Sequence, residues 1–367
     1  MSPQLEQIDA QLDRLAALGP SPFPIVSLYL NLQPDQQGRD RFDSFLRKEL
    51  GDRLRTFEAN GPQRDSLDRD CERIRQFVSE VDPSANGLAL FASSGLNLFE
   101  ALQLAAPIPE HRLHVSDQPH LYPLARVYDA FPRYAVVHAD TNLSRIFVLA
   151  ANLVEKRQNV EGLKTNRSKV GGWSQARYQR HIDNYHLQHI KEVVAMLGDV
   201  VRRDDIKSIV IAGDAVAVPM IKDQLPKELA ERVVDVIKVE DHAAERELFD
   251  ATIDAMREKD RATDRERVDA LIDAYRAGGL AAVGVEAVRH ALDRGQVDEL
   301  ILAATPDAID ARTTRTPEGR LERTAEERLA DELVAKARQT SATIRFVEEA
   351  SLVASIGGVG AHLRFKL

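Results

Sequence analysis

The sequence contains one cysteine and one tryptophan, and it has no apolar run long enough to cross a bilayer. The single thiol, Cys71, excludes an intramolecular disulfide and a zinc site built from several cysteines, and it is typical of a reducing compartment. The segment 1–19 spaces its apolar residues as a helix does, which predicts an amphipathic helix and not a signal peptide. We therefore expect a cytoplasmic protein without a membrane partner.

Basic residues are outnumbered by acidic residues in this chain, 49 against 58. Its 367 residues carry a formal net charge of -9, which argues against a protein that coats nucleic acid non-specifically. The segment 155–180 is an exception, because it holds seven cations and two acids. A solvated surface loop is the simpler interpretation of this charge run, and a local contact with RNA phosphates is the functional one.

Residues 169–180 stand out within this basic segment. They read Lys-Val-Gly-Gly-Trp-Ser-Gln-Ala-Arg-Tyr-Gln-Arg. A glycine pair gives the backbone freedom, and a glutamine is set among cations that favour phosphate, a combination that suits an RNA end better than a protein core. A long helix is predicted from about Tyr178, so the motif would lie at a helix N-terminus, where backbone N–H groups have no helical partner.

Hydrophobic periodicity predicts an α/β fold with three domains. The boundaries are 1–126 for a small N-terminal α/β domain, 127–243 for a mixed-sheet middle domain, and 244–367 for a C-terminal α/β/α sandwich. In the first domain the proline-bearing segment 107–123 is expected to be a connector. In the middle domain a three-stranded meander over 134–160 comes before the long helix and two further strands.

Further helices are predicted at three places in the second half of the chain. One is expected near 216–231, and separate helices are expected over 243–256 and 264–277. The glycines near 357 predict a bend before a final strand. The acidic stretch 326–332 is expected to be a solvated helix face or, alternatively, a surface for a protein partner.

Two stretches of the last domain resemble a known family. Residues 278–302 read Gly-Gly-Leu-Ala-Ala-Val-Gly-Val-Glu-Ala-Val-Arg-His-Ala-Leu-Asp-Arg-Gly-Gln-Val-Asp-Glu-Leu-Ile-Leu, and the chain ends at 357–367 with Gly-Gly-Val-Gly-Ala-His-Leu-Arg-Phe-Lys-Leu. Both resemble the last domain of archaeal and eukaryotic class-1 peptide chain release factors and of Pelota. The middle third is similar to the ribonuclease-H-like domain of that family, which carries a Gly-Gly-Gln loop. Over roughly 127–367 the sequence resembles a bacterial member of the archaeo-eukaryotic release factor superfamily.

The loop departs from the family pattern. Trp173 and Ser174 separate Gly172 from Gln175, and this Gly-Gly-x-x-Gln spacing resembles the branch of the eukaryotic ankyrin-repeat and zinc-finger peptidyl-tRNA hydrolase. The first domain has no motif of the Asn-Ile-Lys-Ser kind that reads stop codons. The resemblance therefore implies codon-independent hydrolysis of peptidyl-tRNA in ribosome rescue or quality control.

The resemblance also implies partners and residue roles. The partners would be the ribosomal A site and peptidyl-transferase centre, the tRNA 3′ end and a translational GTPase. Ester hydrolysis needs one water held against a carbonyl carbon and donors aimed at the oxyanion, so neither a metal nor another cofactor is expected. Gln175 would position water or substrate, and Gly171 and Gly172 would allow the loop its dihedral angles. The candidate RNA-binding residues are Lys164, Arg167, Lys169, Trp173, Arg177 and Arg180.

Other interpretations remain open at this point. The same fold could bind the A site without catalysis, as a hibernation or stress factor, or it could be a nuclease that acts on the tRNA 3′ end. Asp140 and Asp214 each follow a predicted strand, which would suit a two-metal nuclease, although turn residues explain them more simply. His186 and His189 share a helix face, but no cysteine or carboxylate set completes a zinc site there.

Overall fold

The computed structural model describes residues 3–33, 42–82, 85–104, 108–130, 133–139, 143–150, 153–161, 175–238, 245–310 and 324–366. The chain forms two compact units. Phe131–Asp260 make up the first, here called the middle unit. Pro3–Ala130 together with Arg261–Leu367 make up the second, here called the terminal unit. The division of the chain into three domains stays a prediction.

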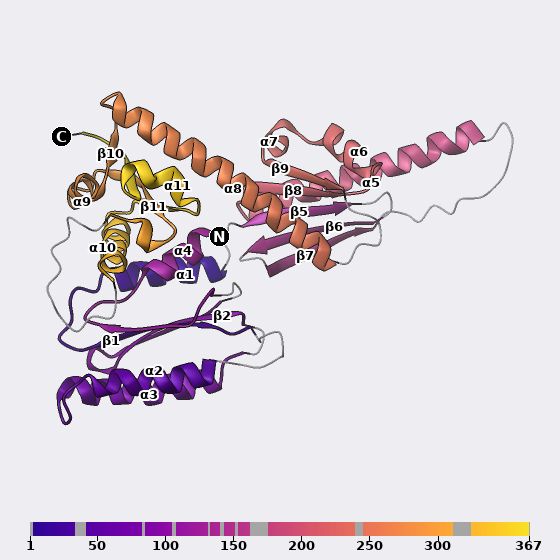
Figure 1. Cartoon of the computed structure of the whole chain (residues 1–367). Helices are drawn as coiled ribbons and strands as arrows, with labels where there is room; N and C mark the ends of the chain where they lie inside the picture. Colours follow the sequence, from indigo (N-terminus) through magenta and orange to yellow (C-terminus); the bar gives the residue numbers. More distant parts are fainter. Residues whose placement is uncertain are drawn as a thin grey trace. The chain divides into compact units, whose positions relative to one another are not determined.

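The first sheet of the terminal unit is antiparallel throughout, in the order β3-β2-β1-β4. Its elements are α1 (Pro3–Ala16), β1 (Ile25–Asn31), α2 (Phe42–Arg55), α3 (Pro62–Ser79), β2 (Gly87–Ser93), β3 (Leu98–Leu104), β4 (Arg112–Ser116) and α4 (Tyr122–Ala130). Helices α2 and α3 lie on one face and α1 and α4 on the other (Figure 1). Side chains alternate between the faces of a strand, so both sides of β1 and β2 are buried. Leu28 and Leu90, for example, share a core with Leu46 and Ile74 of the two helices.

From its prolines we expected the segment 107–123 to be a connector, and this prediction was wrong. The segment contains the strand β4, which pairs with β1, and the start of helix α4. Pro123 is the second residue of α4, a position at which the missing backbone N–H breaks no helical hydrogen bond. Proline therefore marks the beginning of a helix here and not an irregular loop.

The second sheet of the terminal unit has the order β10-β13-β11-β12. Its elements are β10 (Ala281–Val283), α9 (Val285–Asp293), β11 (Val297–Ala303), α10 (Ala325–Gln339), β12 (Thr343–Val347), α11 (Ala350–Val353) and β13 (Val359–Leu363). Strands β11 and β12 are parallel and are joined through α10, whereas β13 is antiparallel to its neighbours. The bend before β13 is confirmed: Gly358 has φ +78°, and a Cβ there would lie 2.2 Å from the carbonyl oxygen of Ala308.

Helix α8 (Glu245–Arg276) is one continuous helix. Two helices were expected, over 243–256 and 264–277, and this prediction was wrong. The residues between them, Arg257 to Thr263, include neither glycine nor proline, so nothing in the sequence ends the helix. Its first half belongs to the middle unit and its second half to the terminal unit.

The middle unit is built on a five-stranded mixed sheet, in the order β7-β6-β5-β8-β9. Its elements are β5 (Tyr134–Ala139), β6 (Leu143–Ala150), β7 (Leu153–Glu161), α5 (Gln175–Arg203), β8 (Ser208–Gly213), α6 (Ala217–Gln224), α7 (Lys227–Ala230) and β9 (Val233–Lys238). The first three strands form the predicted antiparallel meander, and β8 and β9 extend it in parallel with β5. The α/β fold class and the predicted mixed sheet of this part of the chain are therefore confirmed.

Helices cover both faces of this sheet. Apolar residues of α5 and α6 pack on one face with Val137 and Ile211, and Leu248 and Met256 of α8 pack on the other. The helix predicted over 216–231 is two helices, separated at Pro226. None of the helices in the described part of the chain combines the length and the apolar character needed to cross a bilayer.

Candidate functional site

Gln175 is the first residue of helix α5. Since the helix was expected to start near Tyr178, the structure moves its beginning three residues toward the glycine pair and makes the candidate catalytic residue part of the helix. Arg177 and Arg180 lie within the first two turns of α5. The other candidates, Gly171, Gly172, Lys164, Arg167, Lys169 and Trp173, lie outside the described residues.

The later part of α5 is fixed firmly to the sheet. Ile190, Val193, Leu197 and Val200 recur at helical spacing and are all buried in the core of the middle unit. A hydrogen bond adds to this packing, because Nε2 of His189 lies 3.0 Å from Oγ of Ser144 on β6, and both side chains are buried. His189 is therefore a helix anchor, and neither it nor His186 belongs to a metal-ligand cluster among the described residues.

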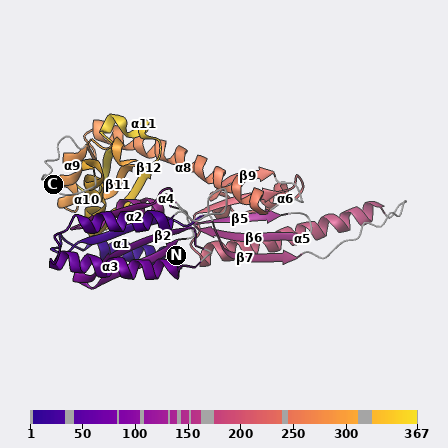
Figure 2. The same cartoon turned by 60° about the horizontal axis from the view of Figure 1, so that its bottom comes forward.

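The start of α5 lies well beyond its anchored part. Among the residues of α5 whose burial is described, from 185 on, the buried ones extend from His189 to Val201, and Gln175 precedes His189 by about 20 Å of helix at 1.5 Å per residue. In both views the beginning of α5 extends past the strand ends of its own sheet (Figures 1 and 2). The middle unit thus holds the first residue of α5 at the end of a long helix.

The electrostatics of this helix end favour negative charge. The first turn of α5 contains no acidic residue, and its last turn contains Arg202 and Arg203. A helix N-terminus carries the equivalent of about half a positive charge, together with N–H groups that have no helical partner. Because no acid offsets this field in the first turn, the end of α5 can accept a phosphate or an oxyanion.

Asp214 is a turn residue, as the simpler interpretation held. Its Oδ1 accepts hydrogen bonds from the backbone N–H groups of Val216 at 2.8 Å and Ala217 at 2.6 Å, where α6 begins. Asp140, its proposed partner in a two-metal nuclease, lies outside the described residues. These hydrogen bonds in the turn before α6 account for Asp214 without a metal.

A second group of polar side chains, which we did not predict from the sequence, lies in the terminal unit. His114 is on β4, His120 lies two residues before the start of α4, and Glu327 is on α10. The two histidines fall in the supposed connector, and the glutamate falls in the stretch that we expected to be solvated. Only the fold brings these residues together, since more than 200 residues separate the histidines from Glu327 in the chain.

Comparison with known proteins identifies relatives for two adjoining parts of the chain. Residues 119–257 match the family model described as bacterial archaeo-eukaryotic release factor family 10, and residues 262–367 match the model of eRF1 domain 3. None of the curated proteins matches the chain.

Among solved structures, archaeal translation termination factor aRF1 is 16% identical with a TM-score of 0.27, covering 99% of this chain and 98% of that one. Dom34 of S. cerevisiae, a translation termination-like factor, is 10% identical with a TM-score of 0.44, covering 77% and 79%. A model of ribosome-bound archaeal Pelota and ABCE1 is 15% identical with a TM-score of 0.42, covering 98% and 94%. Two adjoining segments of this chain, 119–257 and 262–367, are therefore similar to release factor proteins.

Proposed function

We propose that the protein binds the ribosomal A site and hydrolyses the ester of peptidyl-tRNA without reading a codon, with Gln175 at the catalytic tip. The observation that carries this proposal is the position of Gln175 as the first residue of α5, within the part of the chain that matches a release factor family. The same resemblance makes a translational GTPase the expected delivery partner. The biological role would be ribosome rescue or quality control.

The reaction needs little from the protein. The oxygen of one water adds to the ester carbonyl carbon, the bond from that carbon to the tRNA 3′ oxygen breaks, and the 3′ oxygen leaves with a proton. Gln175 would hold the attacking water, and backbone N–H groups at the start of α5 would stabilise the oxyanion. Neither role requires a strong base or a metal, which fits a helix start that has no acidic residue in its first turn.

Arg177 and Arg180 would bind the tRNA acceptor end. They are three residues apart in α5, so their Cα atoms lie on the same side of the helix. Guanidinium groups pair with phosphates in a bidentate manner. Their place within two turns of Gln175 would put phosphate binding beside the ester.

The test is release of a labelled nascent peptide from purified ribosomes stalled on an mRNA without a stop codon. Gln175→Ala should abolish release and leave sedimentation with ribosomes unchanged. Gln179→Ala, one turn further along α5, is the matched control and should retain both activities. Undiminished release by Gln175→Ala would refute the mechanism.

A non-catalytic role is the main alternative. The observation that favours it is the pair Trp173 and Ser174, which separates the glycines from Gln175 and departs from the uninterrupted family loop. A hibernation factor would bind ribosomes and release no peptide, and its binding would be insensitive to Gln175→Ala but lost on charge reversal of Arg177 and Arg180. Shortened tRNA on a denaturing gel would identify a nuclease instead.

A further inference from the structure

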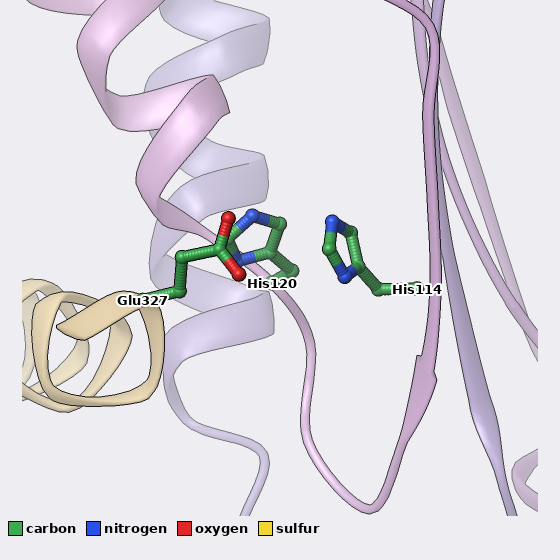
Figure 3. Close-up of side chains that lie close together, drawn as sticks. All are labelled: His114, His120 and Glu327. Carbon is green, nitrogen blue, oxygen red and sulfur yellow. The ribbon is translucent and has the colours of Figure 1, made fainter. Parts of the chain in front are cut away.

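We propose that His114, His120 and Glu327 form a binding site for one divalent transition-metal ion of the zinc class, which links the two sheets of the terminal unit. One ligand atom from each of the three residues lies within 4.8 Å of the others. Figure 3 shows the three side chains facing a common point, two from the N-terminal part of the unit and one from α10. Two imidazoles and a carboxylate are ligands that zinc prefers.

The strongest evidence for a missing ligand is at His120. This side chain is 1% exposed, and no hydrogen-bond partner for its Nε2 is found among the described residues, although that atom is buried. Buried polar atoms in folded proteins normally have a partner. His114 lies against it, with the two ring centroids 4.4 Å apart. A metal ion between these rings and Glu327 would supply the partner that Nε2 requires.

Asp331 holds His120 in the form that can bind a metal. Oδ2 of Asp331 lies 2.7 Å from Nδ1 of His120, and its Oδ1 accepts hydrogen bonds from the backbone N–H groups of Leu121 and Tyr122, both at 2.9 Å. A carboxylate that already accepts these bonds favours a proton on Nδ1, which leaves the lone pair on Nε2. Histidine ligands commonly donate their second ring N–H to such a carboxylate, which orients the ring and makes it a better ligand.

Glu327 can contribute a lone pair without losing its present contacts. Its Oε2 accepts from the backbone N–H of Thr324 at 3.1 Å, and its Oε1 accepts from Nη1 of Arg112 at 3.0 Å. Each carboxylate oxygen has two lone pairs, so one remains for a metal. The Arg112 side chain is 40% exposed and can move toward solvent, which would leave two carboxylates, Glu327 and Asp331, to balance the dication.

Three protein ligands leave one position of a tetrahedral zinc ion for water. The site draws on β4 and the entry to α4 on one side and on the first turn of α10 on the other. Because two ligands come from the N-terminal part of the terminal unit and one from its C-terminal part, bound metal would stabilise the contact between these two parts. This stabilising role of the metal does not depend on the peptide release that we propose for the middle unit.

The test uses the untagged full-length protein, stripped of metal with a chelator and titrated with ZnCl2 by isothermal titration calorimetry. We expect one Zn²⁺ per chain, a rise in Tm with Zn²⁺ concentration, and a tetrahedral absorption spectrum when Co²⁺ replaces Zn²⁺. Glu327→Gln should weaken the Kd for Zn²⁺ at least about tenfold. Glutamine can replace glutamate in the capping box with Thr324, so this variant keeps the helix start and should fold.

Three further variants complete the test. His120→Ala should abolish stoichiometric binding, while Glu326→Gln, the adjacent acid in the same turn, should leave the Kd unchanged. His186→Ala, in α5, should also leave it unchanged, which separates the site from the other histidines. Absence of saturable binding, or equal binding by Glu327→Gln and the parent protein, would overturn the proposal and mean that the three side chains meet only by packing.

Discussion

Arg338 in α10 pairs with Asp9 in α1, with its Nη2 2.7 Å from Oδ1 of the aspartate. The same nitrogen lies 2.6 Å from Oδ1 of Asp13 and also donates to the backbone carbonyl of Asp9. The Arg338 side chain is 15% exposed. Burial lowers the pKa of the guanidinium, but the hydrogen bonds and negative charges of Asp9 and Asp13 together outweigh burial and raise it. One arginine therefore joins the first helix of the chain to the last long one.

Arg338→Ala should destabilise the terminal unit by about 1–3 kcal/mol, because it removes several charge-assisted hydrogen bonds and leaves the partly buried carboxylate of Asp9 and the exposed one of Asp13 without their cation. Urea unfolding followed by circular dichroism measures this. Arg55→Ala is the control, because Arg55 pairs with Asp52 on an exposed surface, and its loss should change the unfolding free energy by less than about 1 kcal/mol. Equal effects of the two substitutions would contradict the role given to Arg338.

Gly213→Ala should destabilise the middle unit by about 1–3 kcal/mol. A Cβ at this position would lie 2.1 Å from the carbonyl oxygen of Ala139, on the neighbouring strand β5, so the two paired backbones would have to separate. Gly51→Ala should instead raise the free energy of unfolding. It replaces a glycine inside α2 with nothing within 4 Å of the new atom, and should stabilise by about 0.5–1 kcal/mol. Thermal unfolding of both variants tests the pair.

Cys71 should resist thiol reagents in the folded protein. It is 1% exposed, and burial raises the pKa of its thiol to about 12, so almost none of the reactive thiolate is present at pH 8. Ellman's reagent should titrate no thiol in native buffer and one thiol per chain in guanidinium chloride. Rapid labelling of the native protein would show that the core around α3 opens readily.

Deprotonation of Asp70 should lower the free energy of unfolding as the pH rises above about 4. Burial raises the pKa of this carboxyl above its ordinary value of 3.8, although the hydroxyl of Ser94 donates to it at 2.5 Å. The folded state therefore binds the proton more tightly than the unfolded state. The resulting stabilisation is fully present below pH 3.8 and is lost as the pH rises through the raised pKa.

Asp70→Asn removes this titration, so the difference in unfolding free energy between the variant and the parent should change across that pH window. Urea unfolding at a series of pH values measures it. Asp68→Asn serves as the control, because Asp68 is an exposed acid on the same helix. The Asp70 assignment fails if the pH profile of Asp70→Asn keeps the slope of the parent.

The sequence predicted those elements whose signal is local. Alternating apolar residues identified β1, β2 and the meander, and the long amphipathic pattern identified α5. Two of the wrong predictions concern prolines. Pro123 predicts a loop but lies in the first turn of α4, and Pro226 separates α6 from α7 where one helix is predicted. A third was the assumption of a break near residue 260, where no residue disfavours a helix.

The candidate sites differ in how far sequence could predict them. Gln175 stays a prediction, and it could be proposed from the sequence because its motif is contiguous and precedes a helix. His114, His120 and Glu327 carry no such pattern, since their proximity depends on α10 packing beside α4. Asp331 is the clearest case, because a residue that seemed to lie on a solvated acidic face is buried and accepts three hydrogen bonds from residues 120–122. Contacts of this kind require the fold.

The pairing of both chain ends in the terminal unit has a consequence for how the protein is made. The middle unit occupies a contiguous segment, so all of its strands leave the translating ribosome before residue 261 does. The contact between His120 and Asp331 spans 211 residues and must wait for α10. The surfaces of α1 and α4 that receive α10 therefore stay uncovered until α10 has been made, and apolar surface that is exposed during this interval favours aggregation.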